Sequence, residues 1–199
     1  EFGPLEDFLN VFSELEFLIS NKAKVDLESF IGQSHPFDEL VEKFNYYQNL
    51  ANHVMCDISR SSTVGMFEVN SERILDTLHE RTQWICDVLV DQMLEDHLEA
   101  NKAICVRYKE MSHTALTIPT NTNEYMALEA FMKKVKHEML AEFNKELLQC
   151  NKRLVFLSDY CTFAPTTIRL NSEPFQWHQK VESILEENAL IMAEKLKEL

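Results

Sequence analysis

The sequence predicts an all-α fold, an elongated antiparallel helical bundle with long rod-like helices and one short extended connector. The 199 residues include only three glycines and five prolines, the two residue types that most disfavour a helix interior. Apolar residues recur at steps of three and four over long stretches, the spacing of an amphipathic helix. Hydrophobic residues make up 45% of the chain, which favours a packed core over a disordered chain.

The first quarter of the chain is predicted to form separate helical pieces. Apolar residues follow helical spacing over residues 5–19. A short piece over residues 27–31 is expected to end at Gly32, because glycine commonly follows the last residue of a helix. A longer amphipathic stripe then predicts a helix over residues 37–59.

An extended segment interrupts the helices between residues 60 and 70. Residues that favour strands alternate around a glycine in Val64-Gly65-Met66-Phe67-Glu68-Val69, which predicts an extended connector or a short strand. For the whole chain we expect two parts, an N-terminal helical segment over residues 1–33 and an elongated helical bundle over residues 34–199.

A long helix is predicted to follow the connector. Asn70 or Ser71 can cap its start, and the apolar stripe continues without a proline to Ala115 or Leu116. At about 1.5 Å per residue, such a helix spans on the order of 65 Å. This length is typical of a rod element and not of a compact domain.

A second long helix is predicted over residues 124–160. Pro119 prevents the preceding helix from continuing, and Thr122 or Asn123 can cap the new one. The apolar steps alternate between three and four, near the 3.5 average of coiled-coil packing. Two helices of this length that are joined by a short turn must run antiparallel.

An aromatic-rich stretch, residues 156–177, separates this helix from a last one. Pro165 and Pro174 each lack a backbone donor and restrict the residue before them. Asn171 or Ser172 can cap a helix that begins near Pro174. We therefore predict a structural joint between antiparallel helices. Its candidate residues are Phe163, Pro165, Leu170, Phe175 and Trp177, with Ile168 as a further contact.

The net charge of −14 limits the classes of partner. Proteins that bind nucleic acid usually present a basic stripe, and an acidic chain is repelled by anionic lipid surfaces. We therefore expect neither nucleic acid nor a membrane as a partner. No apolar run approaches the roughly 18 residues that a membrane span needs, and no basic region typical of a signal peptide begins the chain.

The cysteines predict buried thiols in a reducing compartment. They are odd in number and scattered, and each lies in or beside a helical pattern, which argues against a disulfide framework or a zinc site. They are Cys56, Cys86, Cys105, Cys150 and Cys161.

No pattern predicts a catalytic, cofactor-binding or metal site. The three glycines lie too far apart for a phosphate-binding loop. Glu110-x-x-His113, with Asp76-x-x-His79 as a near variant, matches half of a di-iron motif. These pairs are about 50 Å apart on one predicted helix, so they cannot share a site, and we interpret them as exposed polar pairs.

Three further patterns have both a functional and a structural interpretation. Trp84 and Trp177 could anchor an interface, although packing between helices is favoured. The eight methionines could form an adaptable groove, but their helical spacing favours core positions. A run of acidic residues could attract cations or a basic partner, and a solvated face is favoured; it consists of Asp87, Asp91, Glu95, Asp96 and Glu99.

Both ends of the chain favour a piece of a larger protein. The chain starts without methionine at Glu1-Phe2-Gly3-Pro4, which is typical of residues derived from an expression vector. It stops within the charged helical pattern Glu194-Lys195-Leu196-Lys197-Glu198-Leu199, without a terminating glycine or proline.

A set of motifs in a fixed order resembles the tails of dynein heavy chains. The set covers about residues 35–199 and is most similar to axonemal heavy chains of the single-headed inner-arm type. Pro174, His178 and Leu185 stand where many members of the family carry other residues. The motifs are Val64-Gly65-Met66-Phe67-Glu68-Val69, Pro119-Thr120-Asn121-Thr122-Asn123-Glu124, Phe156-Leu157-Ser158-Asp159-Tyr160, Phe163-x-Pro165, Ile168-Arg169-Leu170-Asn171, Phe175-Gln176-Trp177 and Ile184-Leu185-Glu186-Glu187-Asn188.

The resemblance implies a non-catalytic structural segment of the tail, just before the linker of an ATP-driven microtubule motor. The ATPase modules of such a motor lie in a separate AAA+ ring, so no cofactor is implied for this segment. The implied partners are other segments of the tail and linker, dynein light or intermediate chains, actin or centrin, and microtubules through distant parts of the full chain. The implied location is the cytoplasm, the cytoskeleton and the axoneme of cilia. The alternative is a generic helical adaptor or tethering bundle without a motor.

Overall fold

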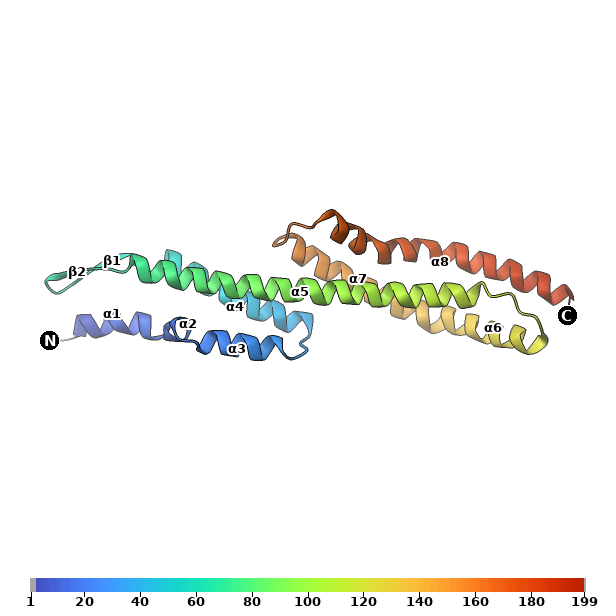
Figure 1. The fold of residues 1–199 in the computed structure, drawn as a ribbon, viewed down its shortest axis with the longest axis horizontal. Helices are drawn as coiled ribbons and strands as arrows, with labels where there is room; N and C mark the ends of the chain where they lie inside the picture. The colour runs from blue at the N-terminus through green and yellow to red at the C-terminus, as the bar shows by residue number, and fades with distance from the viewer. Residues whose placement is uncertain (1–2, 199) are drawn as a thin grey trace. The chain divides into compact units, whose positions relative to one another are not determined.

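The computed structural model describes residues 3–198, and its contacts divide the chain into two compact units, Glu1–Met93 and Leu94–Leu199. Glu1 and Phe2 of the vector-like start, and Leu199 at the end of the charged pattern, lie outside the described residues. The expected all-α bundle with long helices is confirmed (Figure 1). The elongated form and the division after residue 33 stay predictions.

The first unit consists of short helices, one longer helix, a hairpin and the first half of α5. The single helix expected over residues 5–19 is wrong, because the chain turns between α1 and α2 to bring Leu15 and Leu18 into the core. The elements are α1 (Gly3–Ser13), α2 (Glu16–Ile19), α3 (Lys22–Ile31), α4 (Phe37–Cys56), β1 (Ser61–Val64), β2 (Phe67–Asn70) and α5 (Glu72–Ala115).

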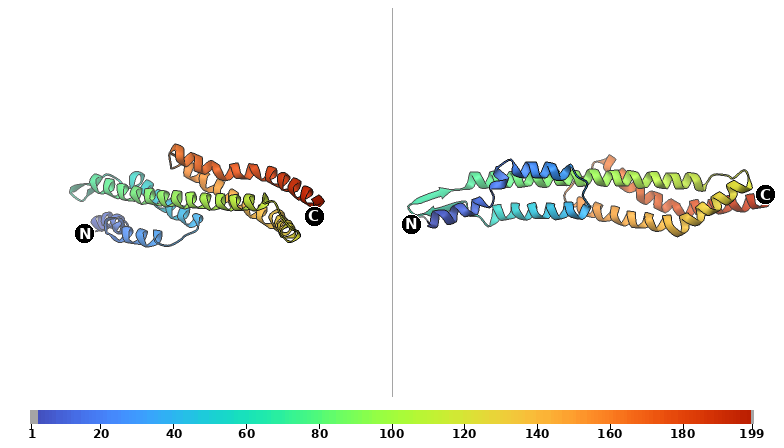
Figure 2. Two further views of the ribbon diagram at one scale, coloured as in Figure 1. Left: turned by 45° about the vertical axis from the view of Figure 1, so that its right-hand side comes forward. Right: turned by 90° about the horizontal axis from the view of Figure 1, so that it is seen from below.

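The core of the first unit lies between α3, α4 and the start of α5. Helix α4 runs antiparallel to α5 (Figure 2), because the hairpin between them reverses the chain. Phe44 and Val54 of α4, and Leu78 and Leu89 of α5, are buried. Arg81 of α5 donates to the last carbonyls of α2, at Leu18 (2.7 Å) and Ile19, groups that have no partner within that helix.

The connector expected after α4 is a two-stranded antiparallel hairpin. Val64 pairs with Phe67, so the turn contains only two residues, Gly65 and Met66. Gly65 adopts a φ of +65°, which other residues rarely tolerate and which two-residue hairpin turns require. The prediction of an extended segment is therefore confirmed, and α4 ends three residues earlier than expected.

Helix α5 is confirmed with the predicted bounds. It has 44 residues, from Glu72 to Ala115. The side chain of Asn70 accepts a hydrogen bond from the backbone N–H of Glu72 at 2.9 Å, so Asn70 is the capping residue of the two proposed. Residues up to Met93 belong to the first unit and residues from Leu94 to the second.

The second unit packs the rest of α5 against two further helical layers. They consist of α6 (Thr122–Lys134), the π-helical segment η1 (Val135–Met139), α7 (Leu140–Ser158) and α8 (Pro165–Glu198). Residues 116–121 and 159–164 form the two turns, and each reverses the chain (Figure 1). Within residues 3–198 no helix combines the length and apolarity that a membrane crossing requires.

The second long helix departs from the prediction in two places. A π-helical turn separates α6 from α7, where a regular helix was expected. The cap is Asn121, which accepts from Glu124 N–H at 2.9 Å, and not Thr122 or Asn123. The carboxylate of Glu124 accepts in return from the backbone N–H of Thr120 at 2.7 Å, and this hydrogen bond is the largest of those that lower its pKa. Such a reciprocal pair resembles the capping box.

Candidate functional site

The predicted joint lies in the second unit, but the last helix begins nine residues earlier than expected. Helix α8 starts at Pro165, and Pro174 is inside it. The expected start near Pro174 is therefore wrong, and Asn171 and Ser172 are helical residues, not caps. Pro165 suits the first helical position because the N–H that it lacks has no partner there in any helix.

The five candidate joint residues separate into two groups. Phe163 is half-buried in the turn and Pro165 is exposed, whereas Leu170, Phe175 and Trp177 are half-buried on α8. Of these, Phe175 and Trp177 pack against the core cluster of the second unit. Ile168 is exposed. The structure thus brings only part of the set together, and a role as a joint stays a prediction.

An aromatic stack joins the three helical layers. The ring of Tyr108 in α5 lies 4.2 Å from that of Phe143 in α7 and 6.4 Å from that of Trp177 in α8, between centroids. Tyr108 and Phe143 are fully buried. Burial raises the pKa of Tyr108 to about 12, so its hydroxyl stays protonated. The Tyr108 hydroxyl lies 3.5 Å from Nδ1 of His178 in α8.

A buried polar cluster lies two to three turns before Tyr108 in α5. His97 and Asn101 of α5 and Asn171 of α8 are all at most 5% exposed. His97 Nε2 lies 3.1 Å from Asn171 Oδ1, and Asn101 Nδ2 lies 3.3 Å from the same oxygen. Arg153 of α7 reaches His97 Nδ1 at 3.4 Å and Cys150 Sγ at 3.2 Å. Three helices therefore contribute to one polar contact.

The arrangement assigns the protonation state of His97. Arg153 can only donate, so His97 Nδ1 accepts, and the ring proton on Nε2 is donated to Asn171. Burial, followed by the positive charge of Arg153, lowers the pKa of His97 to about 4, and the hydrogen bond to Asn171 opposes both effects. His97 is consequently neutral at pH 7.

Polar contacts fix α8 in register along α5. His97 meets Asn171, Lys109 pairs with Glu173 at 3.2 Å, and Asn188 donates to the carbonyl of Ala115 at 2.7 Å. Because the partners advance together along both helices, α5 and α8 run parallel, and α7 runs against both. Asn188 thereby satisfies a carbonyl at the C-terminus of α5 that has no partner within that helix.

The polar cluster is suited to alignment and not to maximal stability. The buried atoms Asn101 Oδ1 and Asn171 Nδ2 have no hydrogen-bond partner among the described residues, and each such atom costs free energy. A shift of α8 by one turn would leave the buried His97 without its partner Asn171. This arrangement costs more free energy than the unpartnered amide atoms of the observed register. The cluster therefore selects one register of three helices.

These polar residues are not among the site residues that the sequence predicted. The apolar stripe of α5 includes Met93, Ala100 and Ile104, and His97 lies within it. The available signal was a polar residue inside an apolar stripe, since His97 and Asn101 lie at helical spacing between Met93 and Ile104. Asn171 and Asn188 likewise end two of the motifs that were quoted, but their burial depends on contacts more than 70 residues away.

The other residues that the sequence singled out, namely the acidic–histidine pairs, the acidic run and Trp84, do not come together in one site. Glu110, His113 and Asp76 are exposed, as interpreted, but His79 is half-buried. No group of three or more His, Cys, Asp or Glu side chains within residues 3–198 is placed to hold a metal ion. Of the acidic run, only Asp96 is half-buried. Trp84 is 44% exposed.

The cysteines agree only in part with the expected buried thiols. Cys86, Cys105 and Cys150 are buried, but Cys56 is exposed and Cys161 is half-buried. Burial raises the pKa of Cys86 and of Cys105 to about 11, and it also raises the pKa of Cys150. Thiols with raised pKa values are poor nucleophiles, so these three are interpreted as core residues.

Fold and site together define a class of protein, a helical bundle whose layers are held in register by buried polar contacts. No protein-family model matches the chain. It is similar to axonemal dynein heavy chains: 27% identical over 158 residues to dynein axonemal heavy chain 3 of Homo sapiens, and 22% identical over 186 residues to dynein axonemal heavy chain 12 of Rattus norvegicus. These alignments cover 79% and 94% of the chain but only 4% and 6% of the relatives.

Proposed function

We propose that the chain is a non-catalytic structural segment of an axonemal dynein heavy chain. The observation that carries the proposal is similarity to two kinds of axonemal heavy chain over most of the chain. The segment belongs to the tail, just before the linker, in a heavy chain of the single-headed inner-arm type. The order of the quoted motifs supports this finer placement.

The proposed role is to carry force between the anchored tail and the linker. A segment under load must keep its helices from sliding, and buried polar partners resist sliding because each shift leaves some of them unpaired. The contacts of α8 with α5 at Asn171 and Asn188 support this role. The segment needs no cofactor of its own, and its place is the cytoskeleton of the ciliary axoneme.

The partners under this proposal are neighbouring parts of the same heavy chain, namely the tail and the linker. Dynein light or intermediate chains, actin or centrin are further partners of the tail. Microtubules are contacted only through distant parts of the full-length protein.

The full-length transcript that contains this sequence provides the test. We expect it to encode a linker and several P-loop ATPase modules downstream of Leu199. A transcript that encodes a helical protein without such modules would contradict the proposal and favour a general adaptor.

The absence of catalysis is tested on the 199-residue chain itself. We expect no ATP hydrolysis above that of a heat-denatured sample. Turnover that scales with the concentration of folded protein would refute the non-catalytic role.

A further inference from the structure

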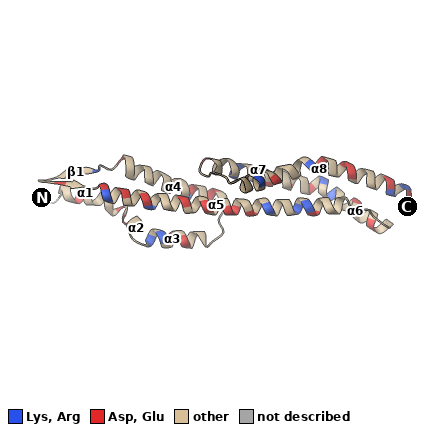
Figure 3. Cartoon of the chain, turned by 45° about the horizontal axis from the view of Figure 1, so that its top comes forward, with Lys and Arg blue, Asp and Glu red and all other residues tan. Residues whose placement is uncertain are grey.

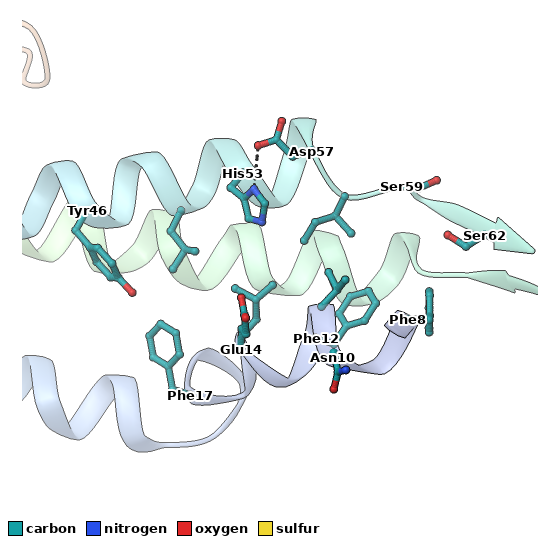
Figure 4. Close-up of a pocket in the computed structure, with 14 residues that line it drawn as sticks. Phe8, Asn10, Phe12, Glu14, Phe17, Tyr46, His53, Asp57, Ser59 and Ser62 are labelled. Atoms are coloured by element: carbon teal, nitrogen blue, oxygen red, sulfur yellow. Dashed lines mark hydrogen bonds and ion pairs between the residues drawn. The ribbon is translucent and has the colours of Figure 1, made fainter. Parts of the chain in front are cut away.

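A groove in the first unit is lined mainly by apolar side chains, with two carboxylates, those of Glu14 and Asp57, among them. It lies between α1–α2 on one side and α4 with the start of β1 on the other, with a cavity volume of about 620 Å3. Figure 4 shows Phe8, Phe12 and Phe17 on the first wall, and Tyr46 and His53 on the second. A volume of this size lies within the range of about 300–1,000 Å3 that is common for binding pockets.

The apolar surface of the groove is open to solvent. Val11 is 42% exposed and Tyr46 is 55% exposed, although both line the groove. Helix α1 has no buried residue, and Leu5 and Leu9 are exposed on it, so its apolar residues from Leu5 to Phe12 span about 11 Å of helix. Exposed apolar residues beside a groove mark a site of interaction, and their arrangement along a helix suits a partner helix.

The charge around the groove selects the partner. The lining includes Glu14 and Asp57 and no Lys or Arg; Asp57 accepts from His53 at 2.9 Å. Residues 1–93 contain six Lys and Arg against 17 Asp and Glu, hence a net charge of −11, whereas residues 94–199 contain 13 against 16, hence −3. Figure 3 shows the charged residues along the helices. A second copy of so acidic a unit would be repelled, and a basic partner would be attracted.

We propose that this groove binds an amphipathic helix of a partner protein, with apolar residues at positions i, i+3, i+4 and i+7 and with Lys or Arg beside them. The apolar stripe of the partner covers Val11, Phe12 and Tyr46. Its basic residues lie near Glu14 and Asp57. The inference stands on the groove alone and does not rest on the proposed function.

The test uses fluorescence anisotropy with a labelled 18-residue peptide of Leu and Lys, in which the leucines form one helical face. One control peptide carries Glu in place of Lys, and a second has the same Leu and Lys content with the leucines scattered. We expect the first peptide to bind the 199-residue chain at least about tenfold more tightly than either control, and more weakly as salt rises.

Paired variants locate the binding site. Val11→Asp adds a negative charge, which alone would favour the basic peptide, so a loss of affinity reports the apolar contact. We expect Val11→Asp to weaken binding at least about tenfold and Val106→Asp, at an exposed valine of the second unit, to have no such effect. Glu14→Lys should weaken binding more than Glu110→Lys. Circular dichroism verifies folding, and Tyr46→Ser, paired with Tyr160→Ser, replaces Val11→Asp if that variant unfolds.

Several outcomes would overturn the proposal. Equal binding of the scattered basic peptide would show non-specific charge attraction, and equal binding of the acidic peptide would remove the charge selection. Equal effects within each pair of variants would place the site elsewhere. Self-association in sedimentation that excludes the peptide would identify a second copy of the chain as the occupant.

Discussion

At the scale of single residues, His97 is the most informative side chain in the molecule. It is 1% exposed and neutral, and its two ring nitrogens face side chains from two other helices, Arg153 and Asn171. Its helical spacing between Met93 and Ile104 indicates that it lies on the buried face of α5. Its partners could not be inferred from spacing, because they lie on α7 and α8.

His97 makes the stability of the second unit depend on pH. Its pKa is about 4 in the folded chain and about 6.5 when unfolded, so the unfolded chain binds more protons between these values. Above pH 6.5, His97 is neutral in both states and does not lower the free energy of unfolding. As the pH falls toward 4, the unfolded chain takes up a proton at His97 and the free energy of unfolding decreases. From pH 7 to pH 4 we expect His97 to lower the free energy of unfolding by about 3 kcal/mol. Urea unfolding of the wild type and of His97→Gln at both pH values measures the difference.

The comparison removes the contribution of the carboxylates, which both proteins share. His113→Gln, which removes an exposed histidine of the same helix, is the matched control and should keep the pH dependence of the wild type. A His97→Gln variant that loses as much stability between pH 7 and pH 4 as the wild type would show that His97 is not held neutral by the fold.

At the scale of helices and strands, the sequence predicted the elements better than their ends. The 44-residue helix and its cap at Asn70 follow from periodicity and capping chemistry, both of which are local. The start of α8 does not, because Pro165 and Pro174 can each occupy the first helical position. In the structure α8 begins at Pro165, and Asn171 within it reaches His97, a contact that local sequence does not reveal. The break before Leu15 likewise serves burial of Leu15 and Leu18, and no glycine or proline marks it.

The π-helical segment coincides with a change in the spacing of the apolar residues. The buried or half-buried residues Val135, Met139, Phe143 and Leu147 follow one another at three consecutive steps of four, which exceeds the 3.6-residue period of an α-helix. A π-helical turn, with i→i+5 hydrogen bonds, accommodates about one additional residue. It allows α6 and α7 to present their apolar residues to the same core.

Deletion of one residue from η1 should therefore be tolerated. Without the exposed His137, α6 and α7 can form one continuous α-helix. The steps between apolar residues from Val135 to Leu147 then average closer to 3.6. We expect the free energy of unfolding, measured by heat and by urea, to change by no more than about 1 kcal/mol.

Deletion of the exposed Gln149 in α7 is the control. It rotates the following residues by about 100° and should cost at least about 3 kcal/mol, because Cys150 and Leu157 leave the core. Similar losses for the two deletions would disprove the accommodation of an additional residue.

At the scale of the whole molecule, each unit builds its core from its own helices. Contacts such as Arg81 with Leu18 close the first unit, and those of α8 with α5 close the second. The sequence predicted a division after residue 33, at a break in the helical pattern. It could not show that contacts divide the chain within a continuous helix, between Met93 and Leu94, because helical periodicity carries no information on which helices meet.

One tryptophan in each unit allows the two cores to be followed separately. Trp84 belongs to the first unit, and Trp177 belongs to the second, where it packs against the core cluster. In Trp177→Phe the fluorescence reports on the first unit, and in Trp84→Phe it reports on the second.

Since His97 lies in the second unit, we expect a fall from pH 7 to pH 4.5 to lower the urea midpoint of the Trp177 signal more than that of Trp84. Addition of His97→Gln to both proteins should reduce this difference. Coincident midpoints at both pH values would instead mean that α5 couples the two units into one cooperative transition.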